Sequence, residues 1–114
     1  MMALDGGQLS EVVAVSASST VGIITVASSK KVYIKSIAAY DISGDACTAH
    51  VYVVPNGDSP VDANKLFHIS LVANETALIE PSYPIVLDTT GDSLRVGVGT
   101  QGPINFFISG DKEA

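Results

Sequence analysis

Two histidines, His50 and His68, and the single cysteine, Cys47, are the side chains of this sequence best suited to catalysis or metal binding. Each histidine lies where polar and apolar residues alternate as in a β-strand, and no His-x-His or Cys-x-x-Cys spacing is present. Cys47 and His50 are three residues apart, so on a strand their side chains would point to opposite faces. We therefore expect packed or surface histidines and a buried cysteine, with no catalytic residue and no metal ligand.

An acidic loop is a second candidate site, because Asp58, Asp62 and Asn64 lie close together in the sequence. Their oxygens are suitable ligands for Ca²⁺, but the spacing does not match the calcium loop of an EF-hand. Asp and Asn also bond to neighbouring backbone groups in turns and helix caps, and we favour this interpretation. Ser59 and Pro60 fit an N-cap and the first position of a single helical turn.

Sequence motifs for other kinds of catalysis are missing. No serine lies in a Gly-x-Ser-x-Gly elbow. Gly97 and Gly99 do not precede a helix whose N-terminus would bind phosphate. We expect no cofactor and no enzymatic activity.

Strand patterns separated by turn residues run along the whole chain of 114 residues, which is the length of one domain. A helical period never lasts beyond one turn, and turn signals recur at the spacing typical of sandwiches. The sequence predicts an all-β, single-domain antiparallel β-sandwich or jelly roll of about eight or nine strands. We assign residues 1–10 to a flexible, extended N-terminal arm, 11–110 to the sandwich and 111–114 to a polar tail.

Two hairpins are expected from short connections between strands. One joins residues 31–42 to residues 47–54, and the other joins 94–98 to 104–108. In 31–42, alternation predicts two faces: Val32, Ile34, Ser36, Ala38 and Tyr40 on one, and Tyr33, Lys35, Ile37, Ala39 and Asp41 on the other. In 47–54, it places Cys47, Ala49, Val51 and Val53 opposite Thr48, His50, Tyr52 and Val54.

The composition indicates a surface that is covered by a partner. Apolar residues make up 46% of the chain and charged residues only 16%, against about 25% charged in a typical soluble domain. A small domain with so few charges is expected to hide part of its surface against another protein. A monomer coated with Ser, Thr and Asn is the alternative.

Net charge and hydropathy exclude several other partners. The formal net charge is −6, and nucleic acid or an anionic membrane would require a basic patch. No apolar run approaches the ~20 residues of a membrane span. The first residues lack the basic and apolar regions of a signal peptide, so we expect synthesis in the cytoplasm.

Six segments carry a resemblance to a known family. They are 31–37 (KVYIKSI), 50–57 (HVYVVPNG), 63–64 (AN), 66–71 (LFHISL), 75–76 (ET) and 91–96 (GDSLRV). In this order the chain resembles small virion proteins of tailed bacteriophages over about residues 30–110. The resemblance concerns a style of β-sandwich, and no binding residue is carried over.

The resemblance implies a capsid decoration, or cement, protein on the outer surface of the virion. Such a protein is expected to form a homo-oligomer, with a trimer favoured, and to bind the major capsid protein. A tail, baseplate or fibre-base component is one alternative. A carbohydrate-binding module is another, because Tyr83 lies between two prolines as an exposed aromatic.

Overall fold

The computed structural model describes residues 4–27 and 30–113, in which the chain forms β-strands and one short 3₁₀-helix. In chain order the elements are β1 (Leu4–Gln8), β2 (Val13–Val15), β3 (Thr20–Thr25), β4 (Val32–Asp41), β5 (Cys47–Val54), η1 (Asp62–Asn64), β6 (Lys65–Leu71), β7 (Thr76–Ile79), β8 (Ile85–Leu87), β9 (Ser93–Val98) and β10 (Ile104–Glu113).

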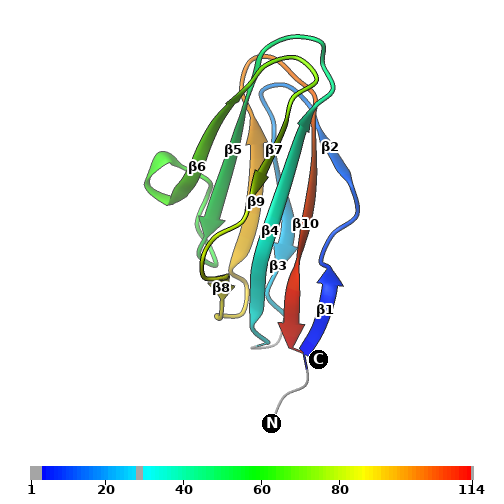
Figure 1. Cartoon of the computed structure of the whole chain (residues 1–114). Helices are drawn as coiled ribbons and strands as arrows, with labels where there is room; N and C mark the ends of the chain where they lie inside the picture. Colours follow the sequence, from blue (N-terminus) through cyan, green and yellow to red (C-terminus); the bar gives the residue numbers. More distant parts are fainter. Residues whose placement is uncertain (1–3, 28–29, 114) are drawn as a thin grey trace.

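The strands form two antiparallel sheets packed face to face (Figure 1). In the first sheet, β4 and β10 lie side by side at the centre; β1 and β2 pair with β10, whereas β7 and β8 pair with β4. The second sheet has the order β3-β9-β5-β6. The all-β antiparallel sandwich is therefore confirmed, and β2 to β10 match the expected number of strands.

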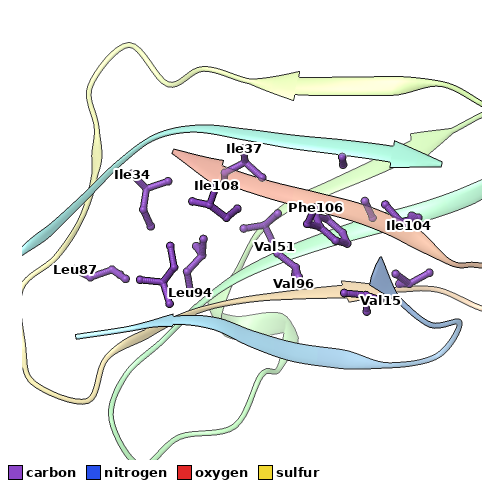
Figure 2. Packing of buried hydrophobic residues seen from close by; sticks show 14 of the residues in the cluster. Val15, Ile34, Ile37, Val51, Leu87, Leu94, Val96, Ile104, Phe106 and Ile108 are labelled. Atoms are coloured by element: carbon purple, nitrogen blue, oxygen red, sulfur yellow. The ribbon is translucent and has the colours of Figure 1, made fainter. Parts of the chain in front are cut away.

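The core lies between the sheets and consists mainly of β-branched side chains, whose stiff χ1 angles suit a pleated surface. Figure 2 shows Ile37, Phe106 and Ile108 of the first sheet facing Val51 and Val96 of the second. All five are fully buried. Each contributes about 1.5–3 kcal/mol relative to an exposed position.

A bulge in β4 overturns part of the predicted alternation. Ser109 on β10 pairs with Ser36, whereas the next residue, Gly110, pairs with Ile34, so Lys35 is an extra residue on β4. The extra residue reverses the alternation beyond it. Ile37 is therefore buried in the core together with Ile34, instead of on the opposite face. The alternation predicted for β5 is confirmed, since Cys47, Ala49 and Val51 are core residues and Val53 packs against them.

The two predicted hairpins are wrong, because both connections cross from one sheet to the other. Strands β4 and β10 belong to the first sheet, and β5 and β9 belong to the second. The connection from Asp41 to Cys47 is long enough to span the ~10 Å between packed sheets. Both neighbouring positions of β4 are occupied by β10, β7 and β8, so β5 pairs with β6 and β9 instead.

The ends of the chain differ from the predicted domain boundaries. Residues Leu4–Gln8 of the predicted arm form β1 and pair with Ser109–Glu113 of β10, a strand that continues past the predicted boundary at residue 110. Main-chain hydrogen bonds join these segments. Because such bonds do not depend on the type of side chain, the pairing cannot be recognised from an alternation of apolar residues in the sequence. Residues 1–3 of the predicted arm and residue 114 of the tail lie outside the described residues.

Candidate interaction surfaces

The two histidines lie next to each other on the outer face of the second sheet. His50 on β5 is the register partner of His68 on β6. Their rings stack with centroids 4.7 Å apart and an angle of 24° between the planes. The sequence alone does not bring the two histidines together, because it does not show the pairing of β5 with β6. Given that pairing, residues 47–54 and 65–71 can be aligned so that the histidines meet.

Tyr52 and Lys65 surround the histidine pair. The Nδ1 atom of His50 lies 3.3 Å from the hydroxyl oxygen of Tyr52. Its Nε2 atom is buried and has no hydrogen-bond partner in the described part of the chain. Burial, followed by the positive charge of Lys65 and the neighbouring His68, lowers the pKa of His50, while Asp62 acts in the opposite direction. His50 is therefore neutral at pH 7 in the free chain.

Arg95 extends this surface onto β9. Tyr52 is the register partner of Arg95 on one side and of Lys65 on the other. The Arg95 Nε atom donates to Ser93 Oγ at 3.2 Å, and its side chain lies over Gly22 of β3. Lys65 forms an ion pair with Asp62 at 3.2 Å. We call the set His50, Tyr52, Lys65, His68 and Arg95 the histidine face.

The outer face of the first sheet carries apolar side chains toward both ends of β4, with the polar Lys35, Ser36, Ser109 and Asp111 between them. Ala38 of β4 lies between Phe107 of β10 and Leu78 of β7. Leu78 is 57% exposed. Tyr33 pairs with Val86 of β8, and Tyr40 lies one row beyond Ala38. The set Tyr33, Ala38, Tyr40, Leu78, Val86 and Phe107 is called the apolar face below.

The acidic loop is held by its own backbone, as the turn interpretation predicted. The side chain of Asn64 accepts a hydrogen bond from the Val61 N–H at 3.0 Å and donates one to the Ser59 carbonyl oxygen at 3.0 Å. Asp62 pairs with Lys65. The helical turn begins at Asp62, with Val61 as its N-cap, so the predicted start at Ser59 and Pro60 was too early. Among the described residues, no cluster of three His, Cys, Asp or Glu side chains could hold a metal.

Cys47 belongs to a buried polar cluster at the arch between β4 and β5. Asp41 is fully buried, and its Oδ1 atom accepts hydrogen bonds from the Ser43 N–H at 2.9 Å and the Ser43 hydroxyl at 2.8 Å. Burial raises the pKa of Asp41, but the hydrogen bonds from Ser43 and Cys47 outweigh it and place the pKa below its usual value. Burial also raises the pKa of the Cys47 thiol. The cysteine is therefore protonated and packed in the core, on the face opposite His50.

The surface hollow beside Cys47 contains no set of side chains suited to catalysis. The hollow beside Cys47 is lined also by Ala46, Thr48, Ser70, Leu71, Val72, Thr100 and Gln101. None of these neighbours is an acid, a base or a nucleophile of lowered pKa. Tyr83, the candidate sugar-stacking residue, is 86% exposed. Among the described residues, no helix is long and apolar enough to cross a bilayer.

Comparison with known proteins shows similarity of structure without similarity of sequence. No protein-family model and no curated protein matches the chain. A chain in the structure of the infectious bursal disease virus Gx strain matches over 97% of this chain, with a TM-score of 0.52 and 12% identity. A chain of the T13 particle of that virus matches over 97%, with a TM-score of 0.54 and 12% identity.

These similarities concern the fold. This chain shares its β-sandwich with part of a virus particle. It spans 32% and 30% of the length of the two matched chains. A chain of the extra small virus of the prawn Macrobrachium rosenbergii, in a virus-like particle, matches with 13% identity over the whole of this chain and 78% of its own length, at a TM-score of 0.47.

Proposed function

We propose that this protein is a non-enzymatic structural component of a virion that assembles into homo-oligomers through the apolar face. The observation that carries the proposal is the exposure of Tyr40, Leu78 and Val86 on one outer face of the sandwich, at 38%, 57% and 46%. Large contiguous apolar patches on soluble domains mark interaction surfaces. The shared fold with chains of a virus particle supports the same function.

The finer assignment follows the bacteriophage resemblance of the sequence. The protein decorates the outer surface of a bacteriophage capsid as a trimer, binds the major capsid protein and stabilises the shell. On this assignment the protein is made in the host cytoplasm. Many small contacts add up in such a shell, because linked binding sites act with high effective concentration.

The apolar face is suited to contact between copies for a physical reason. Its named side chains are uncharged, and the ion pair of Lys35 with Asp111, which lies between Tyr33 and Ala38, neutralises the two charges within the face. Burial of such a surface stabilises an interface by about 25 cal/mol per Å² of apolar area, before the costs of association.

Light scattering after size exclusion tests the proposal on the wild-type chain and two matched variants. At high salt we expect a trimer, near three times 11.8 kDa, for the wild type. Leu78→Asp places a charge in the apolar face and should give monomers. Leu66→Asp is the control, because Leu66 is 50% exposed and lies on β6 of the other sheet. A monomeric wild type, or equal masses for both variants, would contradict the proposal, and a larger ring would favour the tail alternative.

A further inference from the structure

The histidine face lies on the sheet opposite the apolar face. Both can therefore contact partners at the same time. A trimer formed through the apolar faces, as proposed above, leaves the histidine face open on each copy. The inference below rests on that proposed function and concerns this second surface.

The histidine face concentrates positive charge on an acidic protein. The chain has 12 acidic and 6 basic residues, yet Arg95 and Lys65 flank Tyr52 in one cross-strand row. Arg95 has no carboxylate within 4 Å among the described residues. In the part of the chain that the structure describes, Asp62 is the one carboxylate bonded to this face, and its side chain is 97% exposed.

Two neighbouring imidazoles can bind either a metal cation or an anion. A divalent cation would lie close to Lys65 and Arg95, which repel it, and to only two ligands, whereas stable zinc sites have three or four. An anion is attracted by both cations, and the guanidinium group of Arg95 has further N–H donors besides the Nε–H that bonds to Ser93. The charges on this face therefore favour a carboxylate.

We propose that the histidine face binds exposed carboxylates of a second copy of this chain. The copy supplies them in its turns, since Asp45, Asp58, Glu75, Glu80 and Asp88 are all exposed. The two contacting surfaces are different, so the contact is heterologous. Heterologous contacts repeat from copy to copy, and they join trimers into larger arrays instead of closing on a pair.

The contact strengthens on acidification. Lys65, His68, Arg95 and Asp62 are the charged or titratable groups that face His50, together with the hydroxyl of Tyr52. A bound carboxylate favours the protonated form of His50, so protons and carboxylates bind cooperatively.

The test measures the association of copies by light scattering at pH 7.5 and pH 5.5, at low and high salt. A double variant, Arg95→Gln with Lys65→Gln, removes both cations of the face. The control, Lys31→Gln with Lys112→Gln, removes two exposed cations elsewhere and leaves the same net charge. All variants are also made with Leu78→Asp, so that the histidine face is measured without the apolar contact.

At low salt we expect the wild-type trimers to join into larger species, more so at pH 5.5, and at high salt we expect the trimer alone. The double variant should associate at least roughly tenfold more weakly than the wild type, and the control variant should associate as strongly as the wild type. Equal association of the double variant and the wild type would overturn the inference. So would a wild type that forms no larger species but binds polyglutamate through Arg95 and Lys65, because the acidic partner would then be another protein. If the Leu78→Asp variant still associates, and the double variant in the same background does not, the inference is supported even where the proposed trimer does not form.

Discussion

The imidazole rings of His50 on β5 and His68 on β6 stack 4.7 Å apart on the outer face of the second sheet. The pair depends on the register of β5 with β6, in which Thr48 faces Ser70 in the next row. A shift of that register by one residue would turn the His68 side chain toward the core. The stack is therefore a direct consequence of the packing of Phe67, Ile69 and Leu71 against the core.

The stability of the monomer should decrease as the pH falls below about 6.5, the usual pKa of histidine. Folding lowers the pKa of His50, so the unfolded chain binds the proton more tightly and protonation favours unfolding. The contribution of neutral His50 to the free energy of unfolding is complete above the pKa of the unfolded state. It decreases as the pH falls toward the pKa of the folded state. Urea unfolding of the Leu78→Asp variant at several pH values measures it, and adding His50→Gln should flatten the curve between pH 7.5 and 5.5. The same slope with and without His50 would refute the assignment.

The arch between β4 and β5 should depend on the carboxylate of Asp41. Asp41→Asn weakens two charge-assisted hydrogen bonds from Ser43 and should cost about 1.5–3 kcal/mol of unfolding free energy. Because folding lowers the pKa of Asp41, this stability is present above its unfolded value, near 3.8, and is lost as the pH falls through the folded value. Chemical denaturation at pH 7 measures the loss. Asp45→Asn, at an exposed position in the same arch, should change stability by less than about 0.5 kcal/mol, and equal effects of the two variants would be inconsistent with the buried cluster.

Phe106 and Phe107 are neighbours on β10 and should affect different properties. Phe106 is fully buried in the core, so Phe106→Ala should cost about 3–5 kcal/mol of unfolding free energy. Phe107 belongs to the apolar face, so Phe107→Ala should weaken oligomer formation with a small effect on the stability of the monomer. Thermal unfolding of the Leu78→Asp monomer and light scattering of the full oligomer separate the two effects. Destabilisation of the monomer by Phe107→Ala as large as that by Phe106→Ala would place Phe107 in the core instead.

The bulge between β4 and β10 should require glycine at position 110. A Cβ atom there would overlap the carbonyl oxygen of Tyr33, so Gly110→Ala must displace one of the two central strands. We expect a loss of about 2 kcal/mol or more, measured by urea unfolding. Gly22→Ala is the control, because its added Cβ would meet the Arg95 side chain at 3.8 Å, an ordinary contact. A neutral Gly110→Ala would show that the bulge can move.

The sequence by itself determined the all-β class and most strand positions. Strand β5 coincides with its predicted residues, 47–54, because turn residues such as Pro55 limit it locally. Side-chain alternation is also local, and it identified the inward face of β5. The absence of spaced metal ligands and the turn-forming role of Asn64 could likewise be read from neighbouring residues.

Only the tertiary structure decided how the strands pair, and with it the candidate surfaces. The crossing of β4 to β5 between sheets, the bulge at Lys35 and the meeting of His50 with His68 all depend on contacts between residues far apart in the chain. The pairing of β1 with β10 uses main-chain hydrogen bonds, which do not specify side chains. A local pattern tells which side chains share a face of one strand, whereas the packing of two whole sheets determines which strands adjoin and which faces remain open.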